Sequence, residues 1–211
     1  MTAAFIPDRL KALRKTMAGE GLDAFFALNF TNVTYLSGFT GDESFLLLTG
    51  ENHGAANYFI TDSRYTEQAE AECPDYQVIK YRDKYPPLAE TMALLCREHG
   101  VKRVGFEREH MVYSRFEELQ AAAQPDLELA PTSGLPEKLR IVKDAAEIKL
   151  LRHACACTDA VFEGLCGYIH AGLTEKEVEW RLLTLTHEMV CGVSFPPIVV
   201  SGFRWYVRLV W

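Results

Sequence analysis

The stretch FLLLTGENHGAANYFIT, residues 45–61, contains two short apolar runs joined by a polar, glycine-rich connection. Apolar runs of this length bounded by turn residues are typical of buried strands, and the connection between them is typical of a hairpin. Outward from this hairpin the pattern alternates. It predicts strands over residues 23–28, 76–81, 103–107 and 127–129, and helices over residues 8–19, 63–73, 87–99 and 114–123. The alternation through residue 130 predicts an α/β domain with a mixed, partly parallel sheet flanked by helices.

The pattern changes after the turn-rich segment 131–136, where we place a domain boundary. Two long amphipathic helices are predicted beyond it, over residues 144–171 and 174–190. Each opens on a capping-box pair, Asp144 with Glu147 and Thr174 with Glu177. A strand is predicted over residues 197–201. The sequence thus predicts domains at 1–132 and 133–211. The last nine residues, 203–211, contain no acidic residue and read either as a final strand or as an unrelated tail.

The composition excludes several functional classes. The chain has 211 residues with 22 basic and 29 acidic side chains, a formal net charge of −7, so we expect no binding to nucleic acid or to an anionic membrane surface. No apolar run approaches the roughly 20 residues that a membrane-spanning helix needs. No secretory signal is visible and the six cysteines are irregularly spaced, so we expect a cytoplasmic protein with reduced, mostly buried thiols.

Motifs for catalysis and metal binding are scarce. The sequence contains no glycine-rich phosphate loop and no Gly-x-Ser-x-Gly nucleophile elbow. His187 and Cys191 are four residues apart and could share a metal ion on one helix face, but no third ligand is indicated. Cys155 and Cys157 do not have the spacing of a zinc knuckle. We therefore predict no catalytic residue and no metal ligand in this chain.

One polar cluster, Asp62, Arg64 and Tyr65, lies where a predicted strand leads into a predicted helix. Asp62 is placed to cap the helix, and the Arg64 guanidinium is suited to bind a carboxylate through two hydrogen bonds. Because a cation is unfavourable at the positive end of a helix, Arg64 needs a compensating charge. The cluster is interpreted either as an internal capping and ion-pair network or as an interface or substrate-edge site.

Taken together, several motifs resemble the Xaa-Pro aminopeptidases, which with proline dipeptidases and creatinase form the pita-bread metallopeptidase family. The motifs occur in the order and spacing of that family: GLDA at 21–24, NVTYLSGFTG at 32–41, TDSRYTEQA at 61–69, LRIVKDAAEI at 139–148, GLTEKE at 172–177 and SFPPIVVSG at 194–202. The resemblance implies a creatinase-like N-terminal domain followed by the start of an α+β pita-bread domain.

The resemblance also implies a function. The family hydrolyses the bond between an N-terminal residue and a following proline, using two divalent metals, commonly manganese, cobalt or zinc, held by two Asp, one His and two Glu. All five ligands lie downstream of the segment that matches Ser201 and Gly202, where this sequence departs from the family pattern. We therefore expect no metal pair in this chain, and interpret it as the inactive N-terminal portion of such an enzyme, from a truncated or frame-shifted reading frame.

Other expectations follow from the same resemblance. Peptides with proline at the second position are the expected substrates of a full-length relative, and a homo-oligomer is expected, with the N-terminal domain near a neighbour's active site. The alternatives are a non-catalytic interaction module of the same fold, or the corresponding part of a proline dipeptidase or creatinase. Because the two long helices lack most of the sheet they would cover, residues 140–211 are expected to be loosely held or to self-associate.

Overall fold

The computed structural model describes residues 5–82, 85–189 and 191–202. It divides into two compact units, the first ending at Val142 and the second beginning at Lys143. The predicted boundary at 131–136 lies before the observed one. The difference is due to a short helix that the sequence analysis did not predict, α6 (Leu135–Ile141). This helix packs against α1 (Ile6–Gly19) and therefore belongs to the first unit. The predictions made for 203–211 concern residues outside those described.

The first unit is built on a six-stranded sheet in the order β4-β3-β2-β1-β5-β6. The strands are β1 (Ala24–Ala27), β2 (Phe45–Thr49), β3 (Asn57–Thr61), β4 (Gln77–Lys80), β5 (Arg103–Glu107) and β6 (Glu128–Thr132). β2 runs antiparallel to both β1 and β3, and the other neighbouring pairs are parallel. The predicted mixed sheet is confirmed, and the predicted hairpin pairs Phe45 with Ile60.

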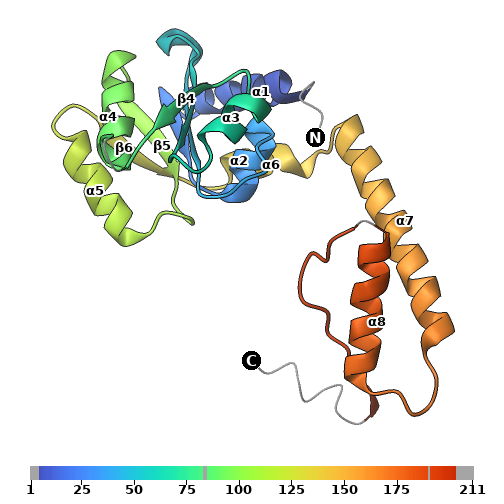
Figure 1. Ribbon diagram of the computed structural model, residues 1–211. Coiled ribbons are helices and arrows are strands. Elements are labelled where there is room, and N and C mark those ends of the chain that lie inside the picture. Colours follow the sequence, from blue (N-terminus) through green and yellow to red (C-terminus); the bar gives the residue numbers. More distant parts are fainter. Residues whose placement is uncertain (1–4, 83–84, 190, 203–211) are drawn as a thin grey trace. The chain divides into compact units, whose positions relative to one another are not determined.

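Helices cover both faces of this sheet (Figure 1). The core on one face includes side chains of α1, α2 (Phe30–Ser37), α3 (Thr66–Glu72) and α6. The core on the other face includes side chains of α4 (Leu88–Glu98) and α5 (Tyr113–Ala123), and a short 3-10 helix lies at Glu51–His53. Successive strand side chains point to opposite faces, so Phe25 enters the first core and Phe26 the second. Both phenylalanines are fully buried, which explains why the strand reads as an uninterrupted apolar run.

One helix of the structure was not predicted, and two predicted elements differ from the structure. The α2 helix was not anticipated; it begins after Asn29, whose side chain accepts the N–H of Thr31, and it ends at Gly38 in the left-handed conformation. The α3 helix begins at Thr66 and not at residue 63, because residues 62–65 form a turn. The strand predicted over 197–201 is wrong, since the described part of the second unit contains no strand with which it could pair.

The second unit consists of two helices, α7 (Ala145–Tyr168) and α8 (Glu175–Glu188), that lie side by side, followed by an extended segment (Figure 1). Both predicted capping boxes are confirmed, at Asp144 with Glu147 and at Thr174 with Glu177. Few of its apolar side chains are buried. Among the described residues, no helix is long and apolar enough to cross a membrane.

Candidate functional site

The polar cluster predicted from the sequence forms at the end of β3. Asp62 follows the strand directly, and its Oδ1 accepts the backbone N–H of Arg64 at 3.0 Å. This turn takes the place of the predicted helix cap, because the carboxylate bonds two residues ahead and the helix begins only at Thr66. The Asp62 side chain is 5% exposed, so its carboxylate is a fixed acceptor.

Arg64 is oriented by that carboxylate. Its Nε lies 3.1 Å from each Asp62 oxygen and its Nη2 lies 2.7 Å from Oδ2, while Nη2 also pairs with Glu43. A second arginine, Arg82, lies 3.5 Å from Asp62 Oδ2 and 3.7 Å from Glu43. The Arg64 side chain is nevertheless 55% exposed, and its Nη1 makes no hydrogen bond to any residue described here. The cluster therefore presents an oriented guanidinium with one donor edge directed away from its own partners.

The charges in this cluster stabilise one another. The hydrogen bonds from Arg64 lower the pKa of Asp62 despite the opposing effect of burial, and the same bonds raise the pKa of Arg64. The Tyr65 ring contacts Phe39 edge to face, with ring centroids 5.9 Å apart. The Arg64 guanidinium carbon lies 5.2 Å from the centroid of the Tyr65 ring. The structure thus brings the three predicted site residues together. Their arrangement is suited to the recognition of a carboxylate or another anion. The three residues do not form a pair of nucleophile and general base.

A buried polar network at the end of β5 was missed by the sequence analysis. The Glu107 carboxylate accepts the backbone N–H groups of Leu28 and Asn29, at 2.5 and 2.6 Å, and the Asn32 amide at 2.5 Å. Asn32 Nδ2 also lies 2.5 Å from Glu137 on α6. Burial raises the pKa of Glu107, and the three hydrogen bonds only partly offset that rise. Because each carboxylate oxygen is occupied by donors from the protein, this network fastens α2 and α6 to the sheet.

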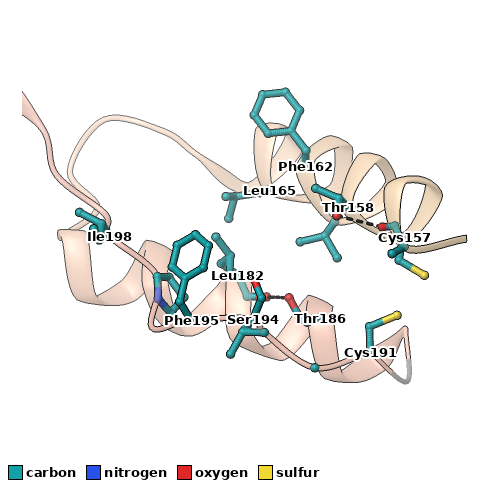
Figure 2. Close-up of a pocket in the computed structure, with 15 residues that line it drawn as sticks. Cys157, Thr158, Phe162, Leu165, Leu182, Thr186, Cys191, Ser194, Phe195 and Ile198 are labelled. Carbon is teal, nitrogen blue, oxygen red and sulfur yellow. Dashed lines mark hydrogen bonds between the residues drawn. The ribbon is translucent and has the colours of Figure 1, made fainter. Parts of the chain in front are cut away.

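The second unit contains an apolar pocket of about 480 Å³. Figure 2 shows α7 along one side of it and α8 with the following segment along the other. Its threonine hydroxyls are turned to their own helices: Thr158 donates to Ala154 and Thr186 donates to Leu182. The pocket therefore offers apolar surface and few polar groups.

The described residues do not fit the metal pair that the resemblance implies. A pair of manganese, cobalt or zinc ions bridged by carboxylates needs several oxygen ligands that converge. In the parts of the chain that the structure covers, three or more His, Cys, Asp or Glu ligand atoms converge in one group, His153, Cys157 and Cys191. Two sulfurs and one imidazole are a different kind of ligand set. Cys155 and His187, considered in the sequence analysis, are not members of the group.

The cysteines also differ from expectation in burial. Cys73, Cys96 and Cys157 are buried, whereas Cys155 and Cys166 are exposed and Cys191 is intermediate. The expectation of mostly buried thiols therefore holds for half of them.

Comparisons with known proteins agree with the fold. Residues 9–142 match the family model described as creatinase/prolidase N-terminal domain. The protein named "Uncharacterized peptidase YqhT" of Bacillus subtilis (strain 168) is 32% identical over 197 residues, which make up 93% of this chain and 54% of that protein. The chain spans about half the length of the curated relatives it matches.

Solved structures give the same result. The Xaa-Pro dipeptidase from Bacillus anthracis superposes with a TM-score of 0.79 at 31% identity, covering 87% of this chain and 49% of that one. The N-terminal domain of the cytoplasmic peptidase PepQ from Mycobacterium tuberculosis superposes with a TM-score of 0.57 at 32% identity, covering 63% of this chain and 98% of that one. The Bacillus anthracis match thus covers about half of a longer peptidase, and the Mycobacterium tuberculosis match covers nearly all of an isolated N-terminal domain.

Proposed function

The chain belongs to the creatinase/prolidase N-terminal domain family, and on this premise we propose that it is the non-catalytic N-terminal portion of a cytoplasmic Xaa-Pro peptidase. In this proposal the complete enzyme hydrolyses peptides with proline at the second position. The two divalent metals belong to the half of the relatives that this chain does not cover. The observation that carries the proposal is the match of the first unit to the family, together with the chain's coverage of about half the length of its relatives.

Arg64 is the residue to which we assign a role in that enzyme. Its guanidinium is held by a buried carboxylate and keeps the Nη1 edge away from its own partners, as a binding group for a carboxylate requires. An unmodified peptide substrate carries a carboxylate at its C-terminus. We therefore propose that Arg64 acts at the substrate edge, with Asp62 and Tyr65 as the residues that position it.

The role of Arg64 can be tested in a chimaera in which this chain replaces the matching N-terminal half of the Bacillus anthracis Xaa-Pro dipeptidase. Arg64→Ala should raise KM for an Xaa-Pro dipeptide by roughly 5- to 30-fold with little change in kcat, because the variant loses a charge-assisted hydrogen bond to the substrate carboxylate. Arg64→Lys should recover only part of the loss. Arg108→Ala is the matched control, because Arg108 is also exposed and paired with a neighbouring carboxylate, Glu109.

A second function for the same cluster is contact with another copy of the chain in a homo-oligomer. The exposed charged group of Arg64, Arg82 and Glu43 favours it, since the rim of an interface is polar and accessible to solvent. A change in the oligomeric state of the Arg64→Ala chimaera, with KM unchanged, would support this function and contradict the substrate-edge role.

A further inference from the structure

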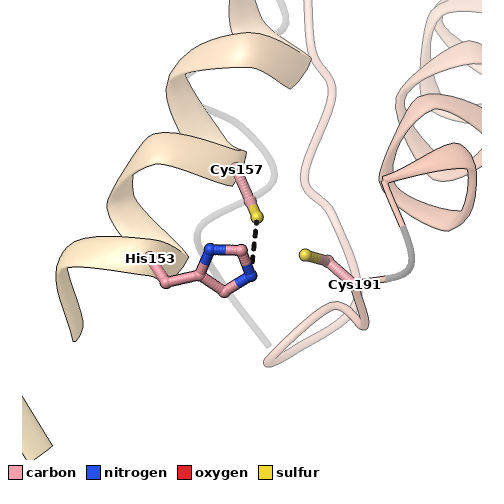
Figure 3. A group of neighbouring side chains, drawn as sticks. All are labelled: His153, Cys157 and Cys191. Carbon is pink, nitrogen blue, oxygen red and sulfur yellow. Dashed lines mark hydrogen bonds between the residues drawn. The ribbon is translucent and has the colours of Figure 1, made fainter. Parts of the chain in front are cut away.

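Three side chains with soft or borderline ligand atoms converge in the second unit (Figure 3). His153 and Cys157 are four residues apart on α7, so they share one face of that helix, and His153 Nε2 lies 3.8 Å from Cys157 Sγ. Cys191 reaches them from the segment after α8. The ligand atoms of all three residues lie within 4.8 Å of one another.

The backbone holds the third ligand in place. The N–H of Cys191 donates to the carbonyl of Thr186 at 3.1 Å, which ties the residue to the last turn of α8. The Cys191 thiol in turn donates to the carbonyl of Met189. Cys157 is buried, Cys191 is intermediate in burial and His153 is exposed, so the group lies partly open to solvent.

The separation of Cys157 Sγ and His153 Nε2 is close to that of two ligands in a tetrahedral zinc site. Bonds of about 2.3 Å to sulfur and about 2.0–2.1 Å to nitrogen at tetrahedral angles place the sulfur and nitrogen atoms about 3.6 Å apart and two sulfurs about 3.8 Å apart. The observed distance of 3.8 Å between Cys157 Sγ and His153 Nε2 needs little adjustment to accept an ion.

We propose that His153, Cys157 and Cys191 bind one zinc ion in a mononuclear site, separate from the metal pair that the family resemblance implies. Two thiolates and an imidazole favour zinc over manganese, which prefers oxygen ligands. The fourth ligand is water or an exchangeable group, because three protein ligands leave one tetrahedral position open. The proposal does not depend on the proposed peptidase function.

The ion would connect two parts of the second unit that are far apart in sequence. It joins the middle of α7 to the segment that follows α8, and Cys157 and Cys191 are both lining residues of the apolar pocket (Figure 2). Binding to the folded state alone stabilises that state. The site would therefore hold one wall of the pocket in place in a unit that has few buried apolar side chains.

The test uses the full chain, reduced with a non-thiol phosphine and titrated with zinc in competition with a chromophoric chelator. We expect one zinc ion per chain and at least 100-fold weaker binding of manganese. Cobalt in place of zinc should give a thiolate-to-metal charge-transfer band and the intense visible bands of tetrahedral cobalt. Cys157→Ser and Cys191→Ser should each weaken zinc binding by more than the roughly 10- to 100-fold that the loss of an outer-shell partner costs.

The control variant is Cys155→Ser, because Cys155 lies on the same helix but is exposed and outside the group. It should bind zinc as the unaltered chain does. Cys191 is partly exposed beyond the end of α8, so Cys191→Ser tests the ligand with little effect on packing, and circular dichroism should show unchanged helix content. Equal loss in Cys155→Ser and Cys157→Ser would overturn the proposal. So would a Cys157–Cys191 disulfide that persists in the phosphine-treated chain without bound metal.

Discussion

Asp62 and Arg64 are joined both by side chain and by backbone: Arg64 Nη2 lies 2.7 Å from Asp62 Oδ2, and the Arg64 N–H lies 3.0 Å from Asp62 Oδ1. The compensating charge that the sequence analysis required for Arg64 is supplied by Asp62 and Glu43. Because the carboxylate is buried and the guanidinium is half exposed, the pair can orient a cation at the surface without placing that cation in the core.

We expect Asp62→Asn to destabilise the first unit by about 1–3 kcal/mol at pH 7, because it weakens a charge-assisted, nearly buried pair. The pKa of Asp62 is lowered in the folded state, so its contribution is present above the unfolded-state value of about 3.9 and is lost as the pH falls through the folded-state pKa. Urea unfolding at neutral and acidic pH measures this. The difference between the two proteins should shrink at low pH, whereas a constant difference would contradict the assignment. Asp126→Asn, at an exposed position, is the control.

The buried Glu107 network should respond to pH with the opposite sign. Its pKa is raised by burial, so its contribution to stability is fully present below the unfolded-state value and is lost as the pH rises through the folded-state pKa. Asn32→Ala removes a donor that lowers this pKa. The variant should raise the pKa of Glu107 further and cost roughly 1–3 kcal/mol at pH 7, since a buried carboxyl group loses one of its hydrogen-bond donors.

A pH titration of the Glu107 carboxyl carbon by NMR, combined with urea unfolding, measures both quantities. Asn52→Ala, at an exposed position, should change neither of them. An unchanged Glu107 pKa in Asn32→Ala would contradict the role assigned to the amide.

The sequence predicted the features that depend on local pattern. Buried strands, the 45–61 hairpin and both capping boxes follow from residues close together in the chain, and all are confirmed. The α2 helix was missed because eight residues give too few periodic positions to read. The strand predicted at 197–201 failed because an apolar run becomes a strand only beside another strand.

Contacts between distant residues were beyond sequence reasoning. Asn32 and Glu107 are 75 residues apart, and nothing local indicates that they meet. The group of His153, Cys157 and Cys191 likewise depends on a contact between distant parts of the chain. The spacing of His153 and Cys157 is visible in the sequence as a possible ligand pair, but their approach to Cys191 depends on how α8 packs on α7.

Limited proteolysis should remove the second unit first. Its buried apolar side chains are few, Cys157 and Leu165 among the described residues, so it opens at low free-energy cost. Thermolysin treatment in the absence of metal, followed by mass spectrometry, should leave a fragment that ends near residue 142. Persistence of the intact chain under conditions that cleave an unfolded control would contradict this.

The exposed apolar side chains of the second unit should cause self-association. Phe162, Phe195 and Ile198 are each about two-thirds exposed or more, at 65%, 67% and 71%. Replacing Phe162 and Ile198 together by serine should increase the monomer fraction several-fold in sedimentation velocity. Tyr113→Ser is the control, because Tyr113 is 74% exposed but lies in the first unit. A wild-type chain that is monomeric at all concentrations would contradict the prediction.

The central claim is that this chain is the non-catalytic N-terminal portion of an Xaa-Pro peptidase. The most direct test is the rate of Xaa-Pro dipeptide hydrolysis, measured with manganese, cobalt or zinc, for the purified 211-residue chain and for its chimaera with the catalytic half of the Bacillus anthracis enzyme. We predict hydrolysis by the chimaera and none by the chain alone. Metal-dependent hydrolysis by the chain alone, abolished by a chelator, would contradict the claim.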